Sequence, residues 1–149
     1  MTLQITISTP QLPRFIAAME KAPEEVKIET GVALTRSTLI VEAEIKALTP
    51  RVTSRLFGAW TSRVDVTAGI GIVGNTTVYA PIIEYGSRPH EIRPKNKKAL
   101  YFNGHFAKVV HHPGTTGQHP ARRGLQGSTF RITTEFRAAV ERVLARVVV

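Results

Sequence analysis

The sequence contains no cysteine, so neither a disulfide bond nor a thiolate metal site can contribute to the fold. Acidic residues are also scarce: 11 Asp and Glu stand against 20 Lys and Arg, which leaves a formal net charge of +9. Aromatic residues make up only 7% of the chain, and the apolar runs are too short for a membrane-spanning helix. Such a basic chain favours polyanions or acidic partners, and we expect no membrane partner.

The length of 149 residues fits a single domain, spanning residues 1–149, that buries roughly 70% of the surface of its unfolded chain. The charge is divided unevenly between the two parts of this domain. Residues 1–50 hold 5 basic and 6 acidic side chains, whereas residues 51–149 hold 15 and 5. We therefore expect the second part of the chain to contact anions.

The first fifty residues predict a strand followed by two helices. Apolar and polar residues alternate over residues 3–7, which is typical of a short strand with one buried face. A short helix that starts near Pro10 and Pro13 is expected through residues 15–19. Pro23 is expected to begin a second, longer helix, because the first helical position needs no N–H group. The longer helix ends before Pro50, since a residue that precedes proline avoids the helical region.

The middle of the chain predicts short strands. Two apolar runs within residues 56–73 flank Ala68 and Gly69 and predict a β-hairpin. Residues 78–84 are compatible with a strand or with one or two helical turns closed by Gly86, to which we assign a positive φ. Three further short strands are expected at residues 90–93, 100–102 and 108–111.

A long C-terminal helix is indicated over residues 125–147, where apolar residues recur every three or four positions. Two pairs on this helix are four residues apart and are expected to form ion pairs: Arg131 with Glu135, and Arg137 with Glu141. Helices at both ends of a run of strands predict an α+β fold. We expect a mostly antiparallel sheet, two long helices packed on one face of it, and a projecting basic hairpin.

That basic hairpin is predicted from residues 88–98, in which Glu91 is the one acidic residue. Pro89 and Pro94 keep the backbone extended and accessible to solvent. A solvated hairpin tip is one interpretation, and contact with DNA phosphate or an acidic neighbouring subunit is the other. Without a helix-turn-helix, zinc-finger or RNA-reading pattern, any DNA contact is expected to be electrostatic and sensitive to salt. The candidate contact residues are Arg88, Arg93, Lys95, Lys97 and Lys98.

Catalytic patterns are weak in this sequence. His111 and His112 are adjacent on an expected strand, so they point to opposite faces and are poorly placed to bind one metal ion. There is no Gly-x-Ser-x-Gly nucleophile motif, and the Gly-x-Gly-x-x-Gly spacing at 69–74 lacks the strand before it and the helix after it that a dinucleotide site needs. We expect no catalytic residue, no metal and no cofactor, and a metal-dependent hydrolase is the least favoured function.

One order of motifs resembles a known family. Tyr-Ala-Pro-Ile-Ile-Glu-Tyr-Gly (79–86) is followed by the Pro- and Lys-rich hairpin, by His-Pro-Gly (112–114) and by the closing helix. From about residue 25 to its end, the chain resembles the small tail-component proteins of long-tailed double-stranded-DNA bacteriophages, also called neck or tail-completion proteins. Relatives carry Pro-Phe and Met-Arg-Pro-Ala where this chain has Gly-Gln-His-Pro-Ala-Arg-Arg-Gly (117–124). The helix is still expected to begin at Pro120.

The resemblance implies a non-enzymatic structural protein of the virion neck or tail, made in the bacterial host cytoplasm. It implies a homo-oligomeric ring, with a hexamer favoured and a dodecamer possible, that joins the head connector or stopper to the tail tube around the passing double-stranded DNA. The residues that it implies for a subunit interface or a structural motif are Tyr79, Glu84, Tyr85, Gly86, His112, Pro113 and Gly114. A free-standing, non-sequence-specific nucleic-acid-binding protein is the alternative.

The total charge of such a ring bears on where its cations lie. Six copies at +9 would carry far more charge than the roughly 24 phosphates in about 40 Å of duplex DNA. Part of the positive surface is therefore expected to meet acidic protein neighbours.

The residues of the 79–86 motif also carry expectations of their own. We expect the apolar and aromatic side chains of Tyr79, Ile82, Ile83 and Tyr85 to pack onto the sheet. A carboxylate among apolar neighbours is costly if it is buried without a partner. Glu84 is therefore expected to pair with an arginine or with backbone donors, within the chain or across a subunit boundary.

Overall fold

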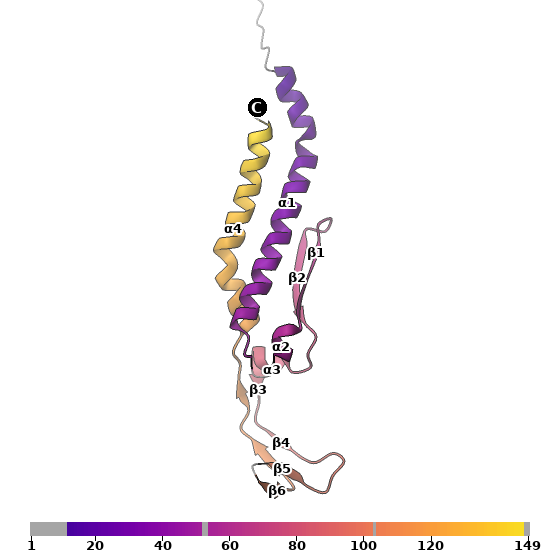
Figure 1. Ribbon diagram of the computed structural model, residues 1–149, viewed down its shortest axis with the longest axis vertical. Coiled ribbons are helices and arrows are strands. Elements are labelled where there is room, and N and C mark those ends of the chain that lie inside the picture. Colours follow the sequence, from indigo (N-terminus) through magenta and orange to yellow (C-terminus); the bar gives the residue numbers. More distant parts are fainter. Residues whose placement is uncertain (1–11, 52–53, 103, 148–149) are drawn as a thin grey trace, which may run out of the picture.

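Two long helices dominate the computed structural model, which describes residues 12–51, 54–102 and 104–147. Helix α1 (Leu12–Leu48) and helix α4 (Pro120–Val147) lie side by side and antiparallel, so that α1 begins near the end of α4 (Figure 1). The strand expected at residues 3–7 lies outside the described residues. None of the helices in the described ranges is long and apolar enough to cross a membrane.

A β-hairpin runs alongside α1. Strand β1 (Trp60–Asp65) pairs antiparallel with strand β2 (Ile70–Asn75), as the sequence predicts, and the short helix α2 (Arg55–Gly58) precedes β1. Helix α3 (Ala80–Tyr85) follows at the base of the long helices (Figure 1). Of the two structures compatible with residues 78–84, the helical one is therefore present.

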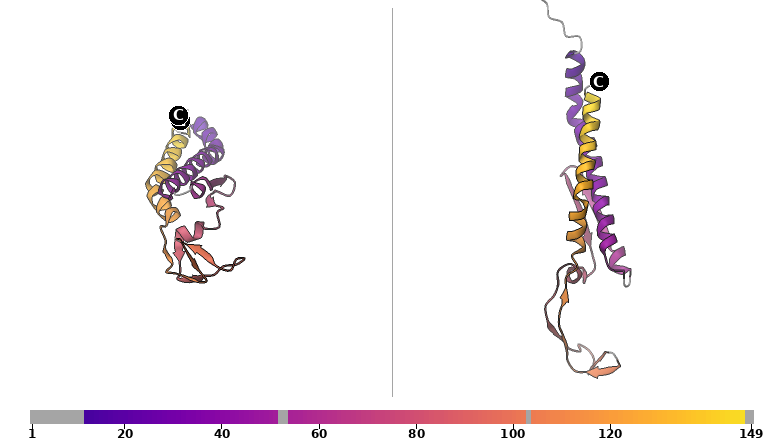
Figure 2. Two further views of the ribbon diagram at one scale, coloured as in Figure 1. Left: turned by 60° about the horizontal axis from the view of Figure 1, so that its bottom comes forward. Right: turned by 90° about the vertical axis from the view of Figure 1, so that its left-hand side faces the viewer.

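Residues 86–116 form an arm that projects beyond the base of the two long helices and curves at its far end (Figures 1 and 2). Its strands pair in a nested antiparallel order, so the arm is one long, interrupted hairpin. The pairs are β3 (Gly86–Ser87) with β8 (Thr115–Thr116), β4 (His90–Ile92) with β7 (Val110–His112), and β5 (Leu100–Phe102) with β6 (His105–Ala107).

The α+β fold is confirmed, with antiparallel strands and two long helices packed together. The strands of residues 12–51, 54–102 and 104–147 are divided among four two-stranded ladders, so within these ranges they do not form one continuous sheet. The β1–β2 ladder packs on α1, and the other three ladders of the described residues make up the arm. Prolines between the short strands of the arm remove backbone donors and interrupt the ladders.

Helix α1 differs from the expectation that a second helix begins at Pro23. The helix continues through Pro23 from Leu12 to Leu48. Pro23 is exposed, so the carbonyl group that loses its helical partner can bind water, which lessens the cost of a proline inside a helix. The predicted end of the helix before Pro50 is confirmed.

The core lies where α1, α4 and the β1–β2 hairpin meet. Val41, Ile45 and Trp60 form its centre, and half-buried apolar side chains of β2 and α4 pack against them. The Trp60 Nε1–H donates a 2.9 Å hydrogen bond to Oγ1 of Thr49, and the Thr49 hydroxyl donates at 2.7 Å to the carbonyl of Ile45. These two bonds fix β1 on the C-terminal end of α1.

Candidate functional site

Ion pairs join the two long helices along much of their length. Arg142 Nε donates a 2.7 Å hydrogen bond to Glu29, and Arg146 contacts the same carboxylate at 3.0 Å. Further pairs link Arg146 with Glu25, Arg36 with Glu135 at 3.6 Å, and Arg131 with Glu44 at 3.9 Å.

The ion pairs expected within α4 are absent from the described residues. Arg131 and Glu135 each pair with α1 instead of with one another, and the salt bridges of the described part of the chain do not include Arg137 with Glu141. A neighbouring helix offered partners that the sequence spacing alone could not reveal.

Glu29 is the most buried carboxylate of these interhelical pairs, with only 8% of its side chain exposed. The hydrogen bond from Arg142 lowers the pKa of Glu29 below its ordinary value, and the positive charges of Arg142 and Arg146 add to the effect, against an opposing contribution from desolvation. The acidic first part of the chain thus neutralises arginines of α4. The arm keeps a net positive charge of its own, because residues 86–116 hold six basic residues and one acidic residue.

Glu84 lies at the base of the arm and is almost fully buried, with 9% exposed. Its Oε2 accepts a 2.8 Å hydrogen bond from the backbone N–H of Ala121, and its Oε1 accepts one of 3.1 Å from that of Arg122. Both donors are in the first turn of α4, where N–H groups lack partners in the helix and the helix dipole favours negative charge. The expected pairing with backbone donors is confirmed, and it occurs within one chain.

Helix α3 holds Glu84 in this position. The Tyr79 carbonyl accepts hydrogen bonds from Ile82 and Ile83 and so starts the helix. Gly86 ends it with the predicted positive φ, here 80°, and a Cβ at this position would lie 2.2 Å from the Thr115 carbonyl oxygen. Glycine is therefore required by backbone angle and by space.

The expectation that the side chains of Tyr79, Ile82, Ile83 and Tyr85 pack onto the sheet is wrong for two of them. Tyr85 is 78% exposed and Ile82 is 43% exposed, while Tyr79 and Ile83 are half-buried. A helix of six residues presents one side to its neighbours, and that side is the one that carries Glu84.

His112 ends β7, and Pro113 and Gly114 connect it to β8 in the arm. His112 Nδ1 accepts a 3.0 Å hydrogen bond from the Gly114 N–H, and the His112 ring stacks on His90 across the β4–β7 ladder with ring centres 5.0 Å apart. Gly114 has a φ of 91°, and a Cβ there would lie 2.4 Å from the Ser87 carbonyl oxygen. The His-Pro-Gly motif thus shapes the stem of the arm.

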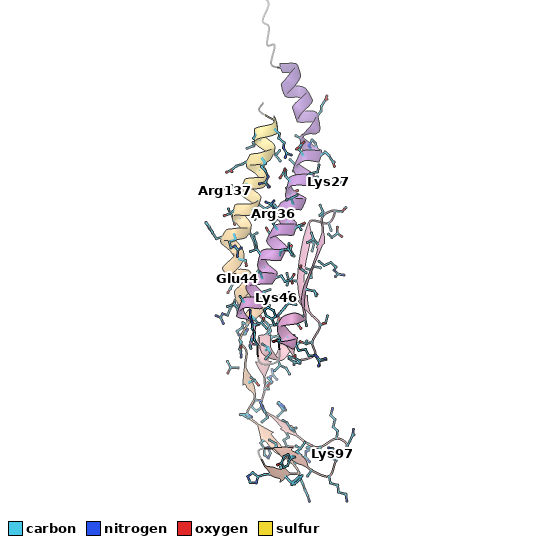
Figure 3. All side chains as sticks on the ribbon, viewed as in Figure 1. Lys27, Arg36, Glu44, Lys46, Lys97 and Arg137 are labelled. Carbon is cyan, nitrogen blue, oxygen red and sulfur yellow. The ribbon has the colours of Figure 1, made fainter. Side chains whose placement is uncertain are left out.

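The predicted basic residues lie on the arm and are exposed to solvent. Lys97 is far from the helices, at the distal end of the arm (Figure 3). Arg93 pairs with Glu91 at 2.7 Å. No ion pair within the described residues involves the other four predicted contacts, which are Arg88, Lys95, Lys97 and Lys98.

Two aromatic residues near these lysines were not singled out from the sequence. Tyr101 and Phe106 face one another across the β5–β6 ladder with ring centres 5.1 Å apart, and they are 69% and 78% exposed. Together with Lys95 and Lys97 they line a shallow depression. In a strand whose residues alternate, the polar residues are the ones predicted to be exposed. Nothing in the sequence therefore indicates that both of these aromatic rings face solvent.

In the part of the chain that the structure describes, no group of three or more His, Cys, Asp or Glu side chains is placed to hold a metal ion. No protein-family model matches the chain, and comparisons with curated proteins and with solved structures give no match.

Proposed function

We propose that the protein is a structural subunit of the head-to-tail junction of a long-tailed double-stranded-DNA bacteriophage. In this proposal, copies associate into a closed ring, with a hexamer favoured, that joins the head connector to the tail tube around the DNA passage. The order of the 79–86 and 112–114 motifs supports the family. The shape and surface of the chain support the subunit role.

The observation that carries the proposal is an excess of exposed surface. The chain exposes 11785 Å², whereas a compact monomer of 16.4 kDa would expose roughly 7500 Å². An upper allowance of roughly 2600 Å² for the residues outside the described ranges still leaves the rest well above a compact monomer of its size. A chain of this kind gains the stability of a buried surface by associating with other copies or partners.

The apolar side chains at the surface support the same conclusion. Large apolar residues are exposed on both long helices, on β2, on α3 and on the arm. Such an extent of exposed apolar surface is unusual for a soluble monomer and is typical of subunit interfaces. The most exposed of them, apart from the arm aromatics, are Val78, Tyr85, Phe130, Leu39 and Leu144.

The way in which charge is distributed over the chain supports a ring around DNA, and it does so better than the total charge. Because α1 carboxylates neutralise several α4 arginines, the helical part is suited to packing against other helices. The arm keeps unpaired cations on a projection. Arms that reach inward or along the passage would contact phosphate, and arms that reach a neighbour would contact acidic protein surfaces.

Assembly of the purified protein tests the proposal. Mass photometry is expected to detect closed oligomers, and negative-stain images are expected to reveal rings with a central passage. Phage particles that lack the protein are expected to accumulate as separate heads and tails. A monodisperse 16.4 kDa monomer at micromolar concentration, together with normal joining of heads and tails in its absence, would contradict the proposal.

The exposed pair of Tyr101 and Phe106 beside Lys95 and Lys97 favours a second candidate, a free-standing nucleic-acid-binding protein. Aromatic rings that stack on bases and cations that track the backbone are the features of non-specific single-strand binding. A salt-titrated DNA shift assay separates the two functions. The second candidate requires a monomer or dimer with micromolar, steeply salt-dependent affinity, and the first requires assembly without DNA.

A further inference from the structure

An apolar groove runs between α4 and β2, with α1 as its floor. Its volume is about 650 Å³, in the range of sites that bind peptides and small ligands. Half-exposed Leu125 is one of the side chains along its wall, so part of the apolar lining faces solvent. The lining residues on α1 and α4 include Leu34, Val41, Ile45, Leu125, Ile132 and Phe136.

Strand β2 forms the other wall of this groove and is the strand of the hairpin nearest to it. Gly71 and Val73 of β2 line the groove, and no residue of β1 does. Within the described residues β2 pairs only with β1, so the backbone N–H and C=O groups along its second edge have no strand partner. An open strand edge of this kind accepts another extended chain.

One segment of the chain has the pattern that this groove requires. Leu3, Ile5 and Ile7 alternate with the polar residues Gln4 and Thr6, and residues 1–11 contain no charged side chain. If the segment is extended, its three apolar side chains share one face. That face can cover the apolar floor of the groove while the backbone pairs with β2.

We propose that residues 3–7 of a second copy of this chain pair with the free edge of β2 and fill the groove. The segment of the same chain is too short to reach it. Of the groove-lining residues on α1, Leu34 is the nearest to the N-terminus, and it lies 22 residues after Leu12, or roughly 33 Å along the helix. The five residues from Ile7 to Leu12 span at most roughly 18 Å.

This inference rests on the self-association in the proposed function, and it adds the contact that each copy contributes to its neighbour. It requires neither DNA nor a phage partner. Failure of the strand contact in a protein that still forms rings therefore overturns only the inference. A protein that stays monomeric at all concentrations overturns both.

Disulfide trapping tests the contact directly, because the natural chain has no cysteine. Ile72 is on the face of β2 opposite to Gly71 and Val73 and is 47% exposed. A full-length copy with Thr6→Cys is mixed with a differently tagged copy with Ile72→Cys, and Ile70→Cys and Gly74→Cys cover the neighbouring registers. Adjacent strands lie about 4.8 Å apart, within disulfide reach.

A disulfide-linked dimer that carries both tags is expected in at least one register. The matched control is Thr6→Cys mixed with Lys97→Cys, on the distal part of the arm, for which no linked dimer is expected. A single chain with Thr6→Cys and Ile72→Cys that closes only on itself would overturn the inference, as would the absence of a link in all three registers.

Substitutions on the two faces of the segment give a second readout. Ile5→Asp would place a charge in the apolar groove, so the concentration for half-assembly is expected to rise roughly tenfold or more. Thr6→Asp adds the same charge on the other face and is expected to leave assembly unchanged. Hydrogen exchange at residues 70–75 is expected to slow with increasing concentration of the natural protein and not with that of Ile5→Asp. Equal effects of the two substitutions would overturn the inference.

Discussion

Glu84 and Ala121 are 37 positions apart, and the carboxylate of the first accepts a 2.8 Å hydrogen bond from the backbone N–H of the second. Pro120, which begins α4, has no N–H, and the N–H of Arg123 already bonds to the His119 carbonyl. The N–H groups of Ala121 and Arg122 are thus the ones left for Glu84, and it accepts from both. One side chain joins α3, the base of the arm and α4.

We predict that Glu84→Ala lowers the free energy of unfolding by about 1–3 kcal/mol, because it leaves two backbone donors of α4 without partners. Chemical denaturation followed by circular dichroism measures this change. The control is Glu141→Ala, an exposed position on the same helix, where a change within about 0.5 kcal/mol is expected. Equal losses at both positions would show that Glu84 is not a specific cap.

Gly124 is predicted to be intolerant of alanine. A Cβ at Gly124 would lie 2.6 Å from a side-chain carbon of Ile45 and 2.9 Å from its backbone nitrogen, so Gly124→Ala would force α1 and α4 apart. We expect a loss of about 1–3 kcal/mol in the free energy of unfolding.

Gly127 is the matched control, because the same helix leaves space there: the nearest atom to an added Cβ is 3.9 Å away, on the Glu44 side chain. Gly127→Ala is expected to raise the free energy of unfolding by up to about 1 kcal/mol through helix propensity. Thermal unfolding of both variants measures the difference. A stabilising Gly124→Ala would contradict the close contact of the helices.

Local features of the fold could be predicted from the sequence. Residues 68–69 marked the turn of the β1–β2 hairpin, Pro120 marked the start of α4, and Gly86 marked the end of α3. Each of these depends on the conformational limits of proline or glycine, which act within a few residues. It was also predictable that Glu84 accepts hydrogen bonds, because a buried carboxylate needs donors.

Features that depend on distant residues could not be predicted. The base of the arm pairs Gly86 with Thr116, thirty positions along the chain, and no local pattern fixes that register. Similarly, Arg131 and Glu135 have suitable spacing to pair with one another, but each forms an ion pair with a residue of α1. The way in which α4 faces α1 determines these partners. Exposed aromatics on the arm were missed because burial is the usual expectation for such side chains.

Stability is predicted to fall in acid through Glu29. Its pKa is lowered in the folded protein, first by the hydrogen bond from Arg142, so the folded state favours the ionised form more than the unfolded state does. The stabilisation is complete above the unfolded pKa of glutamate, roughly 4.3, and is lost as the pH falls through the lower folded pKa. Glu42, whose pKa is lowered first by a hydrogen bond from Lys46, acts in the same direction.

Denaturation between pH 7 and pH 3 measures this effect, and Glu29→Gln is expected to make the free energy of unfolding less dependent on pH below roughly 4.3. Glu141→Gln, the exposed control, is expected to retain the dependence of the natural protein. An unchanged acid dependence in Glu29→Gln would indicate that its pairs with Arg142 and Arg146 do not stabilise the fold.

The cations of the arm are predicted to account for salt-dependent DNA affinity. Lys97 is at the distal end of the arm, and Lys27 is an exposed lysine on α1, far from it (Figure 3). If the arm contacts phosphate, Lys97→Gln is expected to reduce the slope of log K against log salt concentration by about 1, because one fewer counterion is released. Lys27→Gln removes the same charge and is expected to leave the slope unchanged. Fluorescence anisotropy with a labelled duplex at several salt concentrations measures both slopes. Equal slopes for the two variants would place the arm against protein and away from DNA, since only phosphate contact distinguishes these two lysines.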